Sequence, residues 1–170
     1  EVQFISPISG QLAAYRDEAN VAIVLPADDP VASEPPAALI QGLGRTPVST
    51  LKGRHYVAVF DDPEEVAALE PKFDVLETLD LPTIAVTARG NESDYVLRFF
   101  APANGVPEDP VSGVAQCSLM PYWASKLARA ELTSRQLSPQ GGEMNCKMLD
   151  EGVQIAGPCC TLFSGVLETC

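Results

Sequence analysis

The apolar segments of this chain are short, and proline and glycine recur between them. The sequence of 170 residues contains 15 prolines and 12 glycines. Proline removes a backbone donor and glycine favours turns, so segments bounded by these residues suit short strands. One stretch, residues 111–130, instead has the apolar spacing of a helix. Its predicted apolar stripe consists of Val114, Cys117, Leu119, Tyr122, Trp123 and Leu127.

The other predicted elements are strands, together with two shorter helices. One short helix is expected at residues 37–42, and another begins at Asp61, where acids and a proline open it. Groups of strands without a regular strand–helix alternation predict the α+β class rather than a parallel β-α-β array. The predicted strands span residues 2–5, 12–15, 20–25, 47–51, 55–60, 83–88, 95–100, 132–137, 143–149, 153–155 and 161–167.

The charge of the chain limits its partners. Acidic residues outnumber basic residues by 23 to 11, which gives a formal net charge of −12. This charge repels phosphates, so we expect neither nucleic acid nor a membrane as a partner. No apolar run approaches the roughly 20 residues that cross a bilayer. Five cysteines without a Cys-x-x-Cys pair, and one histidine, predict no metal site and reduced thiols in a cytoplasmic protein.

Residues 26–36 are the best candidate for a boundary within the chain. They contain four prolines and three acids, and proline interrupts regular hydrogen bonding. The chain also opens on Glu1 rather than on methionine, which indicates a piece of a longer protein. We therefore expect residues 1–28 and residues 29–170 to belong to different units.

Residues 98–113 are predicted to run from a strand through a loop into the long helix, with Glu108 and Asp109 just before the helix. A helix N-terminus carries unpaired N–H groups and a partial positive charge, so this loop suits a small anion such as a carboxylate. Gly113 would let the backbone approach that anion closely. The alternative is that Asp109 only caps the helix, with Pro110 at its first position. Local chemistry leaves both interpretations open.

An ordered series of unusual residues extends from this segment to residue 143. It consists of Arg98-Phe99-Phe100-Ala101-Pro102, Gly105-Val106-Pro107-Glu108-Asp109-Pro110-Val111-Ser112-Gly113, Cys117, Leu119, Pro121-Tyr122-Trp123-Ala124, Arg135-Gln136-Leu137-Ser138 and Gly141-Gly142-Glu143. The series closely resembles the PhzF-like family of phenazine-biosynthesis isomerases. Weaker agreement covers most of the remaining chain, which resembles the C-terminal part of such a protein.

The resemblance implies a diaminopimelate-epimerase-like fold of two similar lobes. Each lobe would have a mostly antiparallel sheet wrapped around a long central helix. Residues 1–28 would be a remnant hairpin of the N-terminal lobe, and residues 29–170 would be the C-terminal lobe. The active site would lie between the N-termini of the two central helices, so the expected partner is a complementary N-terminal lobe or a second copy in a homodimer.

The resemblance also implies a reaction. Members of this family are isomerases or epimerases that use no cofactor and transfer protons on small carboxylate substrates. Asp109 inherits a catalytic role as the assistant of a glutamate and a histidine of the other lobe. The implied substrate-binding residues are Glu108, Ser112, Gly113 and Val114.

The chain departs from the family pattern in one place. Family members usually show Ser-Ala-His where this chain has Val114-Ala115-Gln116. This change removes side-chain hydrogen bonds from the first helical turn, and His55 lies in a predicted strand too far away to replace the main base. A non-catalytic binding or interaction protein with the same half-fold is therefore the alternative. Cys117 is interpreted as a core residue, because reduced cysteine buries well.

Overall fold

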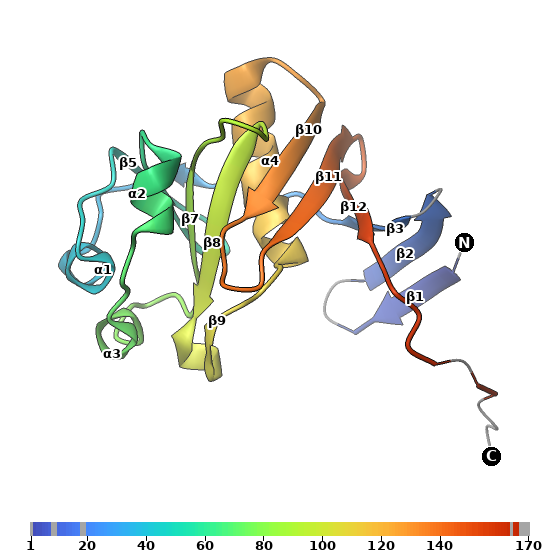
Figure 1. Ribbon diagram of the computed structural model, residues 1–170, viewed down its shortest axis with the longest axis horizontal. Helices are drawn as coiled ribbons and strands as arrows, with labels where there is room; N and C mark the ends of the chain where they lie inside the picture. Colours follow the sequence, from blue (N-terminus) through green and yellow to red (C-terminus); the bar gives the residue numbers. More distant parts are fainter. Residues whose placement is uncertain (1, 8–9, 18–19, 164, 167–170) are drawn as a thin grey trace.

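The computed structural model describes residues 2–7, 10–17, 20–163 and 165–166, and the strands among them form one sheet (Figure 1). The strand order is β1-β2-β3-β12-β11-β10-β8-β7-β6-β5-β4, and β9 pairs with β8 beside this path. Neighbours are antiparallel, except that β6 is parallel to β7 and β8 is parallel to β10. The sheet is therefore mixed, within the predicted α+β class. The strands are β1 (Val2–Ser6), β2 (Gly10–Asp17), β3 (Asn20–Leu25), β4 (Val31–Ala32), β5 (Ser49–Lys52), β6 (Tyr56–Val59), β7 (Ile84–Arg89), β8 (Tyr95–Ala101), β9 (Val106–Glu108), β10 (Glu131–Gln136), β11 (Gly142–Leu149) and β12 (Gly152–Pro158).

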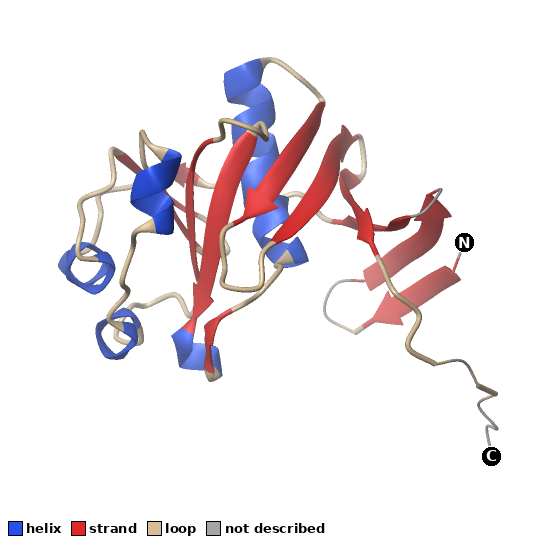
Figure 2. Cartoon of the chain, in the orientation of Figure 1, coloured by secondary structure: helices blue, strands red, loops and turns tan. Residues whose placement is uncertain are grey.

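The longest described helix, α4 (Gly113–Leu127), packs against the sheet, and Figure 2 shows it beside the strands of one face. Its Trp123 ring stacks on Tyr95 of β8, with the ring centroids 5.8 Å apart. The indole N–H of Trp123 donates to Thr87 Oγ1 at 2.9 Å, so the one polar atom of this buried ring is satisfied. This helix and strands β6–β8 and β10–β12 therefore share one core.

Three short helices contribute to a second core on the other face of the sheet. Successive side chains of a strand point to opposite faces, and β8 follows this rule, since Leu97 belongs to the α4 core and Val96 to the second core. Leu39, Val66 and Leu76 from the three short helices fill the second core. These helices are α1 (Ala37–Leu43), α2 (Pro63–Ala67) and α3 (Phe73–Leu76).

The long helix is shorter than the predicted 111–130. It begins at Gly113, because Ser112 has extended backbone angles and forms the N-cap. It ends at Leu127, because Ala128 adopts the left-handed conformation with φ of 53°. The inclusion of Val114 in the buried stripe was wrong, since this side chain is 45% exposed. The wrapping of a sheet around this helix stays a prediction.

The end of the chain also differs from the prediction of a strand at residues 161–167. Residues 159–163 form neither helix nor strand and are exposed, and residues 164 and 167 lie outside the described part. The structure confirms the other predicted strands and both predicted short helices, with ends shifted by a few residues. Sequence patterns missed β4, β9 and α3, each of which has two to four residues.

The proline-rich segment 26–36 is bound to the core rather than free. The backbone N–H of Asp28 donates to the Cys117 carbonyl at 2.8 Å, and the Asp28 carboxylate accepts from Ser118 Oγ at 2.8 Å. Before this segment, β3 pairs with β12 from Asn20 to Leu25. One continuous sheet thus contains residues of both predicted units, and the division at residues 28 and 29 stays a prediction.

His55 lies in the α4 core without a hydrogen-bond partner. The residue is completely buried, and neither ring nitrogen has a partner among the described residues. Its ring meets Phe99 edge-on, with the centroids 5.4 Å apart. Burial in this apolar contact lowers the pKa of His55 from 6.5 to about 4.

This burial predicts a pH-dependent stability. Between pH 6.5 and about pH 4 the unfolded chain binds a proton at His55 that the folded chain excludes, so the free energy of unfolding falls as pH falls. The expected loss is about 3 kcal/mol across this window. Urea unfolding at pH 7 and pH 4.5 measures it, and the His55→Leu variant is expected to lack this component. Equal losses in both proteins would show that His55 does not carry the effect.

Candidate active site

The loop with the predicted catalytic residue lies between the edge of β8 and the start of α4. After β8 the chain forms a short 3-10 helix, η1 (Pro102–Asn104), and turns at Gly105, whose φ of 76° suits glycine. Strand β9 then returns antiparallel to β8, and the Asp109 N–H donates to the Phe99 carbonyl at 2.9 Å. This hydrogen bond fixes the first residue of the loop.

Gln136, the last residue of β10, holds both ends of the loop. Its side chain is almost completely buried, and its amide nitrogen donates to the Asp109 carbonyl at 2.5 Å. Its amide oxygen accepts from the Ser112 N–H at 2.8 Å. Ser138 supports the middle of the loop, because its hydroxyl donates to the Pro110 carbonyl at 2.6 Å. One buried amide therefore sets the position of the loop relative to the sheet.

Sequence reasoning included Gln136 and Ser138 in the family resemblance but gave them no role. A signal was present, because β10 alternates between exposed and buried residues and Gln136 occupies an inward position. A buried side-chain amide needs hydrogen-bond partners. An inward glutamine at the end of a strand therefore indicates a nearby backbone segment that it supports.

The first turn of α4 decides between the two interpretations of Asp109. Ser112, and not Asp109, caps the helix, because the Ser112 hydroxyl accepts from the Ala115 N–H at 3.4 Å. The Asp109 carboxylate is half-buried and has no hydrogen-bond or ion-pair partner in the part of the chain that the structure describes. The capping alternative was wrong, and the role of Asp109 in catalysis stays a prediction.

The start of α4 offers backbone donors at an open surface. The N–H groups of Gly113 and Val114 lie in the first turn, where a helix has no internal acceptor for them. Val111 and Val114 are 43% and 45% exposed, so solvent reaches this turn. A methyl group on Gly113 would contact only Ile23 and Ile155, at 3.8 Å and 3.9 Å. The three predicted residues Ser112, Gly113 and Val114 thus lie together beside Asp109, at a helix end that suits an anion.

Glu108 has a partner within the protein. Both of its carboxylate oxygens accept from the Arg98 guanidinium, at 2.8 Å and 2.9 Å. Arg98 also donates to the Leu69 carbonyl at 2.8 Å, which connects β9 to the segment that follows helix α2. A two-point pair of this kind fixes geometry well. Because Arg98 occupies both oxygens, this geometry does not support a direct substrate contact by Glu108, which stays a prediction.

The departures from the family pattern lie in two environments. Gln116 is completely buried, and its side-chain oxygen accepts from the hydroxyl group of Tyr95. It therefore points into the core and not toward Asp109. Val114 is exposed at the helix start, so it is the departure that changes the surface of the candidate site. Cys117 is buried as expected, and burial raises the pKa of its thiol.

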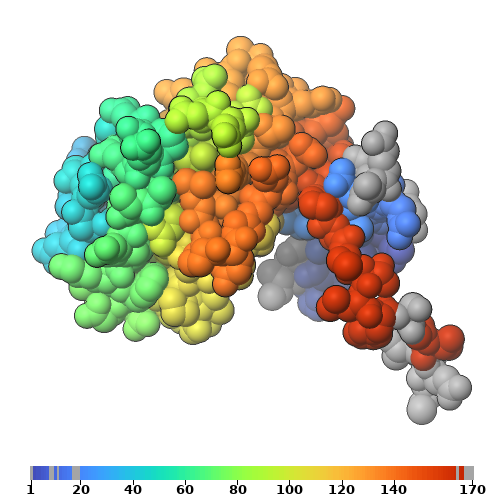
Figure 3. Space-filling view, in the orientation of Figure 1, coloured from blue at the N-terminus to red at the C-terminus, as the bar shows by residue number. Residues whose placement is uncertain are grey.

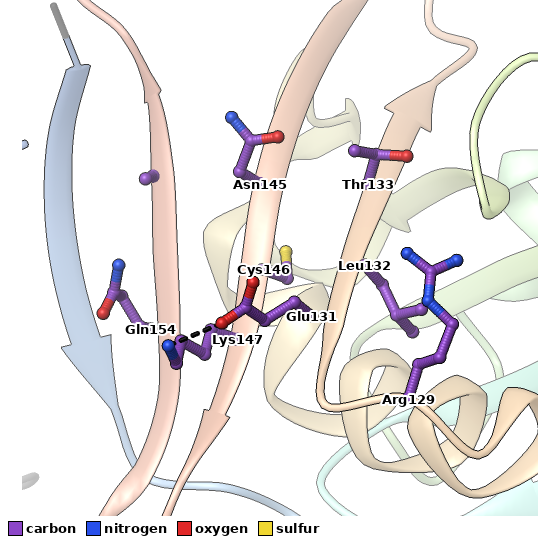
Figure 4. A pocket seen from close by; sticks show the side chains of 9 residues that line it. Arg129, Glu131, Leu132, Thr133, Asn145, Cys146, Lys147 and Gln154 are labelled. Carbon is purple, nitrogen blue, oxygen red and sulfur yellow. Dashed lines mark ion pairs between the residues drawn. The ribbon is translucent and has the colours of Figure 1, made fainter. Parts of the chain in front are cut away.

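A separate hollow of about 430 Å³ lies over β10, β11 and β12 (Figure 4). None of the predicted site residues lines it, and the Lys147–Glu131 ion pair at 2.6 Å belongs to its wall.

No group of three or more potential metal ligands occurs within the described ranges. None of the helices described in this chain has the length and apolar character to cross a membrane.

The role of Gln136 predicts a measurable loss of stability. Gln136→Leu would leave the Ser112 N–H and the Asp109 carbonyl without partners, at a cost of about 1–3 kcal/mol in the free energy of unfolding. Gln140→Leu, at an exposed position in the next loop, is the matched control and should change stability little. Urea denaturation compares the two variants. A similar effect of both would contradict the role assigned to Gln136.

Solved structures of the PhzF family share the fold of this chain over most of its length. A phenazine biosynthesis protein of the PhzF family from Enterococcus faecalis has a TM-score of 0.87 at 34% sequence identity, and the match covers 92% of this chain and 60% of that chain. A putative PhzC/PhzF protein from Clostridium difficile also has a TM-score of 0.87, at 29% identity over 99% of this chain and 65% of that chain. The chain therefore has a PhzF-type, diaminopimelate-epimerase-like fold.

Sequence comparison identifies the family. Residues 33–165 match the PhzC-PhzF family, described as phenazine biosynthesis-like protein, and the chain belongs to this family. An uncharacterized isomerase of Pseudomonas aeruginosa is 42% identical over 165 residues, which are 96% of this chain and 63% of that protein. The predicted family is confirmed. The chain spans less than two thirds of the length of this relative, and its identity as a C-terminal part stays a prediction.

Proposed function

We propose that this chain supplies half of the active site of a cofactor-independent isomerase or epimerase that acts on a small carboxylate substrate. The observation that carries the proposal is the free Asp109 carboxylate, held by its backbone between β8 and Gln136 and placed beside the first turn of α4. Isomerase-named relatives support the reaction class.

The proposed chemistry is proton transfer at a carbon next to the substrate carboxylate. Removal of this proton develops negative charge, which backbone N–H groups and the positive end of a helix offset. In this chain Gly113 and Val114 would bind the carboxylate, and Ser112 would keep the helix end in place. Asp109 would assist by exchanging a proton with the substrate or with the main base.

The main acid/base is proposed to come from a second lobe. Among the described residues, His55 is completely buried against Phe99 and the Glu108 carboxylate is paired with Arg98, so we assign the role of main base to neither. The relatives are longer than this chain, which supports a complementary N-terminal lobe as the source. A second copy in a homodimer is the other source that we consider. Exposed Val111 and Val114 would border such a partner. A cytoplasmic location is part of this proposal.

One observation favours a different class of function. Val114 replaces a serine of the family pattern at the exposed turn, which would weaken substrate binding and suits a non-catalytic binding protein. Incubation with amino and hydroxy acids in D₂O separates the two functions. Deuterium at a substrate carbon requires proton transfer, whereas a binding protein leaves the carbon unlabelled.

The role of Asp109 predicts a large kinetic effect. In a protein that contains both lobes, Asp109→Asn removes a proton-exchanging group and should lower turnover roughly 10²- to 10⁴-fold. Because the fixing hydrogen bonds involve only the backbone of Asp109, the fold should remain. Asp61→Asn, at an exposed position, is the control and should keep full turnover. Equal turnover in the two variants, measured by deuterium exchange, would remove the assigned role.

The exposed turn predicts a gain of affinity. Val114→Ser adds a hydroxyl donor at the first turn of α4 and should lower KM about two- to tenfold, which corresponds to one hydrogen bond of about 0.5–1.5 kcal/mol. Val106→Ser is the matched control, because Val106 is also 45% exposed but lies in β9. An unchanged KM for Val114→Ser, or the same gain in the control, would argue against substrate binding at this turn.

A further inference from the structure

Two adjacent cysteines, Cys159 and Cys160, follow the last strand and take no part in the proposed reaction. Both side chains are exposed and both thiols are free. Cys159 makes one weak contact, in which its thiol donates to the Gly157 carbonyl at 3.8 Å. The segment that contains them, residues 159–163, has no helix or strand and extends away from the body of the molecule (Figure 3). Few backbone hydrogen bonds therefore oppose its adjustment around a ligand.

The other described cysteines are protected from chemistry at the surface. Cys117 and Cys146 are only 1% and 2% exposed. Burial raises the pKa of both thiols, and that of Cys146 reaches about 11. The thiolate is the reactive form of cysteine, so burial suppresses both access and reactivity. Among the described cysteines, Cys159 and Cys160 are therefore the two whose thiols a reagent in solution can reach.

Adjacency disfavours a disulfide within the pair. The described peptide bonds are trans, and a trans peptide sets neighbouring Cα atoms about 3.8 Å apart. Disulfides usually join Cα atoms about 4.4–6.8 Å apart. Cys159 and Cys160 thus stay available as two thiols. If one atom bridges the two sulfurs, the ring that closes through both side chains and the peptide bond is larger than in a disulfide. The short distance between the Cα atoms then opposes ring closure less.

We propose that Cys159 and Cys160 form a dithiol site for a soft, thiophilic centre that binds two sulfurs, such as trivalent arsenic or monovalent copper. An organic arsenic oxide loses its oxygen as water, which carries away both thiol protons, and two As–S bonds replace the bond to oxygen. Arsenic stays trivalent, so no electron acceptor is needed. Copper(I) displaces the same two protons to solvent.

The site lies at the end of the sheet that carries the start of α4. Gly157 lies beside the Glu143 carbonyl at the beginning of β11. Gly142 pairs with Gln136, which in turn holds the loop from Asp109 to Ser112. The chain leaves β12 at this end (Figure 1). The dithiol site is nevertheless independent of the proposed isomerase activity, since it uses neither Asp109 nor α4.

Phenylarsine oxide tests the site on the 170-residue chain. The native protein is treated with phenylarsine oxide in the presence of an excess of a monothiol. The monothiol displaces arsenic that only one protein sulfur holds. The intact mass of the protein is then measured. One phenylarsine group per chain is expected, with release by 2,3-dimercaptopropanol. Cys159→Ser and Cys160→Ser should each reduce retention at least tenfold, whereas Cys170→Ser keeps the pair and should retain the group.

Two results would overturn the assignment. Retention in either single variant of the pair would mean that one thiol, or another cysteine, holds the arsenic. Loss in Cys170→Ser would show that the pair does not act as the chelate. A second experiment tests copper(I), which is supplied from a competing chelator, and measures how much copper the protein retains. Retention that needs both Cys159 and Cys160 supports copper as a ligand, and no retention by the unmodified chain refutes the copper part of the proposal.

Discussion

The side-chain amide of Gln136 connects the end of β10 to both ends of the loop from Asp109 to Ser112, which lies far from it in the sequence. It ends β10, donates to the carbonyl of Asp109, and accepts from the N–H of Ser112. A neutral amide suits this task, because it satisfies one donor and one acceptor together without placing a charge in the core. With the loop fixed through its backbone, the Asp109 side chain keeps no structural task. The candidate site is therefore built by hydrogen bonds that leave its reactive group free.

The two faces of the sheet have different parts in this arrangement. The face that carries α4 holds the helix at a fixed distance from β8 through the stacked rings of Tyr95 and Trp123. The other face supports the loop indirectly, since Arg98 joins Glu108 to the carbonyl of Leu69, just after α2. A nearly buried charge pair is stabilising only with good geometry and further partners. Here the two-point contact and the carbonyl provide both.

The first turn of α4 shows how a family pattern can change without change in the fold. At the position of Gln116 the side chain is enclosed by the core, where it bonds to Tyr95. At the position of Val114 the side chain faces the surface, and a valine there removes a polar group without disturbing packing. The departure at Val114 therefore changes the exposed surface of the candidate site, whereas the one at Gln116 changes a contact inside the core.

The sequence alone determined the α+β class, the family and nearly all strands and helices, because these follow from local spacing and from ordered motifs. It also placed Asp109, Ser112, Gly113 and Val114 together in one segment that leads from the loop into the helix, since they are neighbours in the chain. Only the tertiary structure decided that Ser112 rather than Asp109 caps α4, and that Glu108 binds Arg98. These outcomes depend on competition between possible partners and on contacts between residues far apart in the sequence, such as Gln136 with the loop. Such contacts exist only after the sheet has formed, so no local pattern specifies them.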